Sequence, residues 1–199
     1  MRKLALFALV IVLLGFTSLG TENSPTAATP APAQLADVAT SVTETTITPP
    51  LPENTYPVVK VIDGDTVSIM KEGRSVTLRL IGLDTPETVD PRKPVQCFGK
   101  AASDKAKELL TGKNVRLEFD ASQGILDKYG RTLAYVFLPD GRMFNGFMIA
   151  EGYGHEYTYN LPYKYQKEFK AAEKRAREEQ KGLWADDTCA GNTKKPTAS

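Results

Sequence analysis

Three short polar clusters hold the side chains with which this sequence could do chemistry. The clusters occupy residues 63–66, 79–87 and 127–131, and apolar runs typical of strands flank them. Together they supply carboxylates that can hold a hard cation or move a proton, and arginines that can bind a phosphate. Cleavage of a phosphodiester needs this combination, because the anionic substrate and its more anionic transition state must both be neutralised. The residue types therefore indicate phosphodiester hydrolysis.

The elements that must position these clusters follow from the apolar pattern. Alternating apolar residues bounded by turn signals predict short strands, at residues 58–62, 66–70, 76–80, 115–119 and 133–138. Apolar residues at helical spacing predict helices, at residues 98–109, 145–151 and 162–181. Strands in this order, with one helix after the third strand and two after the fifth, predict a small closed or nearly closed β-barrel with helical additions.

The second and third predicted strands bring two of the clusters together. The second strand leaves from Asp65 and the third returns toward Asp84, so antiparallel pairing places both carboxylates at the same end of the sheet. Arg79 alternates with apolar neighbours in the third strand and should point to the opposite face from them. A concave face of the barrel can receive its guanidinium.

Each cluster alone also has a simpler interpretation. Asp-Gly at residues 63–64 is common turn chemistry, residues 85–87 can begin a helix or loop, and residues 127–130 can form a polar loop. The joint occurrence of all three in this order favours an active site. His155 is the only histidine. A nuclease that depends on an imidazole as base or metal ligand would need this one residue for every such role. We therefore expect His155 to be structural or a surface group near Tyr157.

The chain begins with the composition of an export signal. Arg2 and Lys3 precede an unbroken apolar run at residues 4–14, which is short for a membrane span. We expect a signal peptide over residues 1–20, with an uncleaved amino-terminal anchor as the alternative. Residues 21–57 are rich in Thr, Pro and Ala and predict a disordered linker.

The rest of the chain is expected to hold one domain over residues 58–189, followed by a flexible tail over 190–199. The net charge of +1 neither favours nor excludes a nucleic-acid partner. Cys97 and Cys189 are the only cysteines. An even count in an exported chain favours a disulfide between them, with two free thiols or a metal pair as the alternative.

Residues 61–66, 78–87 and 127–135 resemble the staphylococcal nuclease (thermonuclease) family, and the likeness extends over about residues 58–184. The resemblance implies an α+β, mainly β fold, in which a five-stranded OB-fold barrel carries three helices. It also implies calcium-dependent hydrolysis of DNA and RNA to products with 3′-phosphate ends.

The resemblance assigns the metal site residue by residue. Asp65, Asp84 and the backbone carbonyl of Thr85 match the calcium ligands, and Asp63 matches a carboxylate near the metal. Hard oxygen donors suit Ca²⁺, whereas no cluster of Cys and His supports zinc. Glu87 matches the carboxylate that positions or deprotonates the attacking water.

The resemblance assigns the substrate contacts in the same way. Arg79 and Arg131 match the pair that binds the phosphoryl oxygens. Arginine suits this role because its planar guanidinium can contact two oxygens at once. Lys128 and Tyr129 match a contact to a terminal phosphate. Tyr157 and Tyr159 match residues that line a nucleotide pocket. The loop at residues 120–127 is slightly longer than usual and lacks basic residues, which bears on substrate affinity and preference.

The sequence as a whole predicts a secreted or surface-tethered, calcium-dependent nuclease. We expect a monomer that acts on DNA and RNA, preferably single-stranded or frayed, since aromatic stacking is tolerant of sequence. No dedicated protein partner is implied, and membrane contact would come only through an uncleaved amino-terminal segment. The main alternative is a catalytically silent OB-fold module that binds nucleic acid. A surface or adhesion protein would leave the ionic residues unused.

Overall fold

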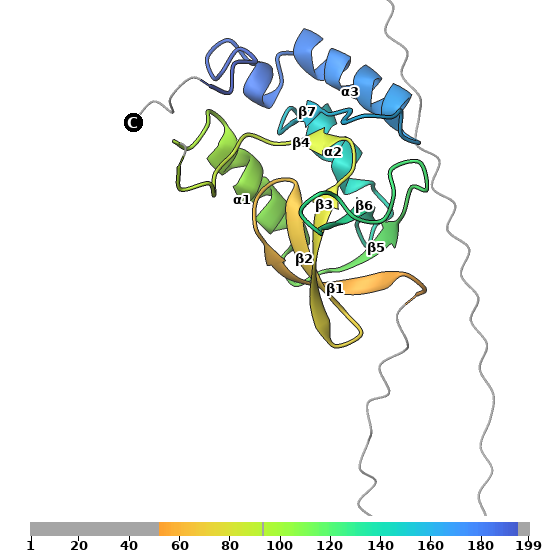
Figure 1. Cartoon of the computed structure of the whole chain (residues 1–199). Helices are drawn as coiled ribbons and strands as arrows, with labels where there is room; N and C mark the ends of the chain where they lie inside the picture. The colour runs from red at the N-terminus through yellow and green to blue at the C-terminus, as the bar shows by residue number, and fades with distance from the viewer. Residues whose placement is uncertain (1–51, 93, 195–199) are drawn as a thin grey trace, which may run out of the picture. The chain divides into compact units, whose positions relative to one another are not determined.

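The computed structural model describes residues 52–92 and 94–194, in which strands close into a barrel accompanied by three α-helices (Figure 1). The predicted signal segment and most of the predicted linker lie outside the described residues. Among the described helices, none has the length and hydropathy that a membrane span requires. The predicted five-stranded barrel with three helices is confirmed.

The barrel strands neighbour one another in the order β1-β2-β3-β6-β5. Their bounds are Thr55–Val61 (β1), Thr66–Lys71 (β2), Arg74–Leu80 (β3), Asn114–Glu118 (β5) and Thr132–Phe137 (β6). Neighbours are antiparallel except β3 and β6, which run parallel. β1 pairs with β5 through residues 55–57 and with β2 from Val58 onward, and these two pairings close the barrel. A register shift between Val58 and Lys60 follows the change of partner.

The remaining elements lie outside the barrel sheet. They are β4 (Leu83–Asp84), α1 (Gly99–Leu110), α2 (Phe144–Ala150), β7 (His155–Glu156), α3 (Gln166–Glu178) and the 3₁₀ helix η1 (Gly182–Trp184). The two short strands, β4 and β7, pair antiparallel and were not predicted. In Figure 1, α2 lies between the barrel and α3.

The third helix is shorter than the sequence predicts. It starts at Gln166 instead of residue 162, because tertiary bonds hold the preceding residues in a different conformation. The backbone N–H of Lys164 donates to Asp120 (2.8 Å), and the hydroxyl of Tyr163 donates to Glu156 (2.8 Å). The predicted apolar stripe of this helix is buried, with Phe169 at 3% exposure.

A buried amide joins the barrel to α2. Asn145 is fully buried; its Oδ1 accepts the N–H of Val136 on β6, and its Nδ2 donates to the carbonyl of Ile81, both at 2.9 Å. Buried polar groups are stable only when paired in this way. The bonds hold the chain just after β3, where the backbone turns at Gly82 (φ 75°) toward β4.

The described domain extends beyond the predicted boundaries at both ends. β1 begins at Thr55, so residues 55–57, predicted as linker, belong to the barrel. Near the carboxyl end, the carbonyl of Thr193 accepts the N–H of Cys97 (3.0 Å), so residues assigned to a flexible tail are bonded to the domain. The predicted disulfide between Cys97 and Cys189 is confirmed.

Candidate active site

Arg79 is the centre of the predicted ionic cluster. From the end of β3, its Nη1 lies 2.8 Å from Asp65 Oδ2 and donates to the carbonyl of Leu83 (2.8 Å). Its Nη2 donates to Asp84 Oδ1, also at 2.8 Å. The hairpin of β2 and β3 places Asp65 and Asp84 at the same end of the sheet, as expected, and one guanidinium lies between the two carboxylates. The Arg79 side chain is only 14% exposed, so these bonds fix its direction.

The cluster carries more negative charge than Arg79 neutralises. Burial and the charge of Asp65 both raise the pKa of Asp63 above its ordinary value, and Asp63 Oδ1 accepts the N–H of Asp65 (3.2 Å). Desolvation and the charge of Asp65 likewise raise the pKa of Asp84, although Arg79 acts in the opposite direction. Crowded carboxylates behave in this way when too little positive charge faces them. The site is therefore suited to receive a cation.

The donor set at this position is compatible with a hard cation. Asp65 and Asp84 offer carboxylate oxygens, and the N–H of Thr85 donates to Asp65 Oδ2 (2.8 Å), which places the Thr85 backbone beside them. Within residues 52–92 and 94–194, no group of three or more His, Cys, Asp and Glu is placed to hold a metal ion. A cation here would depend on two carboxylates, backbone carbonyl oxygen and water, a combination typical of calcium and magnesium.

A second guanidinium is held by the loop that precedes β6. Arg131 Nε and Nη2 both reach Asp127 Oδ2 at 2.7 Å, and Asp127 Oδ1 accepts the N–H groups of Tyr129 and Arg131 (2.9 Å each). Burial raises the pKa of Asp127, but these bonds outweigh it and the net shift is downward. The carboxylate therefore stays ionised and keeps Arg131 in place at neutral pH.

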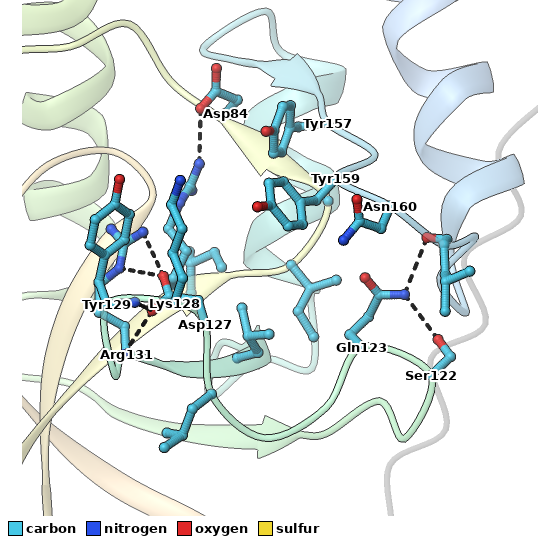
Figure 2. Close-up of a pocket in the computed structure, with 17 residues that line it drawn as sticks. Asp84, Ser122, Gln123, Asp127, Lys128, Tyr129, Arg131, Tyr157, Tyr159 and Asn160 are labelled. Carbon is cyan, nitrogen blue, oxygen red and sulfur yellow. Dashed lines mark hydrogen bonds and ion pairs between the residues drawn. The ribbon is translucent and has the colours of Figure 1, made fainter.

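Both guanidinium groups open onto one cavity of about 560 Å³ (Figure 2). Seven of the predicted site residues line it, namely Arg79, Asp84, Lys128, Tyr129, Arg131, Tyr157 and Tyr159. Figure 2 shows Lys128, Tyr129 and Arg131 on one side and Tyr157 and Tyr159 across from them. The rings of Tyr157 and Tyr159 are 6.3 Å apart and both are exposed, so they offer apolar faces to a planar ligand.

The other predicted site residues lie outside the lining of this cavity. Asp63, Asp65 and Thr85 do not line it. They are linked to the site through Asp65, which contacts Arg79, accepts the N–H of Thr85 and donates its own N–H to Asp63. Glu87 Oε1 accepts the three N–H groups that follow it in the chain, those of Thr88, Val89 and Asp90, at 2.9, 2.7 and 3.1 Å. The Glu87 carboxylate is therefore tied to its own loop, an arrangement that the motif alone did not predict.

The cavity also has a wall that the sequence did not predict. It includes Ser122 and Gln123 from the loop after β5, and Asn160 and Leu161 from the loop after β7. Gln123 Nε2 donates to the carbonyl of Leu161 (3.2 Å), so the two loops are bonded to each other. The unusual length of the 120–127 loop was the one sequence signal that pointed to this region.

His155 occupies a structural environment, as predicted. It lies in β7, its Nδ1 is 3.6 Å from Glu173, and its ring meets the ring of Trp184 edge-on at 4.9 Å between centroids. Its partner across the short sheet is Asp84. The imidazole therefore supports the strand that carries Asp84.

A closed barrel with a carboxylate–arginine centre beside an aromatic cavity defines a site suited to nucleic-acid phosphodiesters. Residues 77–186 match the family model described as "Staphylococcal nuclease homologue". The chain is similar to thermonucleases of Staphylococcus hyicus (48% identity over 134 residues, 67% of this chain and 78% of the relative) and Staphylococcus intermedius (49% over 129 residues, 65% and 75%). It is also 37% identical over 127 residues to endonuclease YncB of Bacillus subtilis (63% and 59%).

The chain therefore belongs to the staphylococcal nuclease family, as the three motifs predicted. Membership of this family supports a nuclease whose substrate is nucleic acid.

Proposed function

We propose that this protein is a calcium-dependent nuclease that hydrolyses DNA and RNA to products with 3′-phosphate ends. The observation that carries the proposal is the position of Arg79 between Asp65 and Asp84, at the edge of a cavity that also contains Arg131. This arrangement brings together the charges that phosphodiester cleavage requires.

The two arginines neutralise the scissile phosphate. Each is aimed by a carboxylate, Arg79 by Asp65 and Asp84 and Arg131 by Asp127, so little reorganisation is needed when the phosphate enters. Asp65, Asp84 and the Thr85 carbonyl would hold Ca²⁺, which when bound supplies additional positive charge against the phosphoryl oxygens.

Glu87 is the proposed base. It accepts a proton from a water molecule whose oxygen forms the new bond to phosphorus, while the bond from phosphorus to the 5′-oxygen breaks. The phosphate stays on the 3′-oxygen of one product, and the 5′-oxygen of the other product takes up a proton from solvent. The three backbone bonds to Glu87 Oε1 restrict the carboxylate to one orientation. A fixed base reduces the entropy that must be lost before the transition state.

The aromatic side of the cavity is the proposed nucleotide site. The exposed faces of Tyr157 and Tyr159 suit stacking on a base, and Lys128 and Tyr129 on the opposite side suit a terminal phosphate. Stacking requires an unpaired base, so this site favours single-stranded or frayed substrates.

A secreted or surface-attached monomer is part of the same proposal. The Cys97–Cys189 disulfide supports it, because disulfides persist in oxidising compartments. The export signal and the linker predicted over residues 1–57 agree with it. We propose no dedicated protein partner, and membrane attachment only through an uncleaved amino-terminal segment.

A catalytically silent module that binds nucleic acid is the second candidate. One observation favours it: the Glu87 carboxylate is bonded to its own loop and does not line the cavity. A binding module would need the cavity and the arginines but neither the base nor calcium.

The deciding experiment measures hydrolysis of single-stranded DNA by the wild-type protein and by Glu87→Gln, with Ca²⁺ and with excess chelator. We expect calcium-dependent cleavage to 3′-phosphate ends in the wild type, and a loss of about 10²–10⁴-fold in the variant, the range typical of a general base. Folded wild-type protein that binds DNA without cleaving it would favour the silent module. Full turnover by Glu87→Gln would remove Glu87 from its role.

A further inference from the structure

Gln96 holds both polar groups of the Glu87 backbone. The Glu87 N–H donates to Gln96 Oε1 (2.8 Å), and the Gln96 N–H donates to the Glu87 carbonyl (3.0 Å). A single residue nine positions further along the chain therefore closes the loop that carries the proposed base. Because both backbone groups are fixed, the Cα atom that carries the Glu87 side chain is fixed as well.

The amino-terminal end of α1 supports the same loop from behind. A Cβ atom on Gly99 would lie 3.1 Å from the Glu87 carbonyl oxygen and 2.8 Å from Thr88 Cγ2. The first residue of the helix thus approaches the Glu87 backbone more closely than most side chains would permit. The loop has little room to relax away from its position.

The residue after Gln96 is anchored to the carboxyl-terminal segment. Cys97 forms the disulfide with Cys189, which is fully buried, and its N–H donates to the carbonyl of Thr193 (3.0 Å). The carboxyl-terminal segment is itself bonded to η1, since the N–H of Gly191 donates to the Leu183 carbonyl (2.8 Å). Gln96 is therefore held by a covalent link to a distant part of the domain.

We propose that Gln96 is a positioning residue for Glu87 and that the Cys97–Cys189 disulfide holds Gln96 in place. The inference rests on the proposed function, because it assumes that Glu87 acts on the attacking water. Neither Gln96 nor Cys97 lines the substrate cavity. Their loss should therefore lower kcat and leave KM nearly unchanged, since displacement of a catalytic group slows the chemical step without weakening substrate contacts.

The test compares Gln96→Met with Gln96→Glu. Met keeps the size of the side chain but cannot accept the Glu87 N–H, whereas Glu keeps an acceptor oxygen at the same distance along the chain. We expect kcat to fall about ten- to a hundredfold in Gln96→Met, with KM within about twofold, and to recover in Gln96→Glu. Gln180→Met, an identical change at an exposed position outside the cavity, is the matched control and should match the wild type.

Hydrogen exchange gives a readout that does not depend on activity. The Glu87 and Gln96 amides should exchange faster in Gln96→Met than in the wild type, while the amides of β2 and β3 keep their protection. In Cys97→Ala/Cys189→Ala the same two amides should exchange faster, with the same selective loss of kcat.

The outcomes separate this inference from the proposed function. Wild-type kcat and unchanged exchange in Gln96→Met, together with loss of turnover in Glu87→Gln, would overturn the inference alone. Equal loss of kcat in Gln96→Met and Gln96→Glu would also overturn it, because the acceptor oxygen would then be irrelevant. Wild-type turnover by Glu87→Gln would refute the role of Glu87 and this inference with it, although the protein would still be a nuclease. Folded wild-type protein that binds DNA without cleaving it would instead refute the proposed function.

Discussion

Substitution of Asp120 by Ala should destabilise the domain and weaken substrate binding together. Asp120 is 9% exposed, and its Oδ2 accepts the hydroxyl of Tyr135 (2.9 Å) and the N–H of Lys164 (2.8 Å). Its Oδ1 accepts the N–H and the hydroxyl of Ser122, at 3.0 and 2.7 Å. One carboxylate therefore connects the barrel, the segment before α3 and the loop that forms one wall of the cavity.

The magnitude follows from the groups that the substitution leaves unpaired. Tyr135 is fully buried, so its hydroxyl would lose its partner where water cannot replace it. An orphaned buried group costs about 1–3 kcal/mol, and the Lys164 N–H adds a smaller amount. We expect the free energy of unfolding to fall by about 2–4 kcal/mol, a large part of the roughly 5–15 kcal/mol typical of a domain.

The assay is urea denaturation of four proteins: the wild type, Asp120→Ala, Tyr135→Phe and the double variant. Tyr135→Phe removes the donor, so the double variant should be about 1–2 kcal/mol more stable than the sum of the single effects predicts. In the proposed nuclease, KM should rise in Asp120→Ala because Ser122 loses its anchor beside Gln123. Two results would refute the reasoning: strictly additive changes in the free energy of unfolding in the double variant, or a fall below about 1 kcal/mol in Asp120→Ala.

Two further predictions concern stability. Cys97→Ala/Cys189→Ala should lower the free energy of unfolding by about 4–5 kcal/mol, since the disulfide closes a loop of 92 residues, and an unchanged urea midpoint would contradict this. Stability should also fall in acid: burial raises the pKa values of Asp120 and Asp127, but hydrogen bonds outweigh it and lower both below 3.8. A carboxylate whose pKa is lower in the folded state than in the unfolded state stabilises the fold at pH values above its ordinary pKa. This stabilisation is lost as the pH falls through the folded-state pKa. Urea midpoints should therefore decline once the pH falls below the ordinary value of 3.8, and the midpoint of Asp127→Asn should decline less steeply. Above that pH the raised pKa values of Asp63 and Asp84 act in the opposite direction.

Local patterns were sufficient to predict the centre of the site. Asp65 and Asp84 flank a hairpin, and Arg79 alternates with buried neighbours, so the strand period and the turn chemistry are enough to place all three side chains together. The strand pattern alone predicted a barrel that was either closed or nearly closed. The family resemblance added the OB-fold topology.

Tertiary structure alone decided which groups hold the site in place. Gln96 bonds to the backbone of Glu87, Gln123 to the carbonyl of Leu161, and Asp120 to the N–H of Lys164. Each of these contacts ends on a backbone atom of a residue at least nine positions away. Every residue type offers nearly the same backbone groups, so no pattern of side chains along the chain marks the partner.

The same reason explains why the third helix is shorter than the sequence predicts. Helical spacing is a property of neighbouring residues, but the bond from Lys164 to Asp120 joins residues 44 positions apart and sets where α3 begins. The sequence by itself was enough to predict the family and the residues proposed to perform its chemistry. The folded chain determined how firmly each one is held, because hydrogen bonds between distant segments form only once the barrel has brought them together.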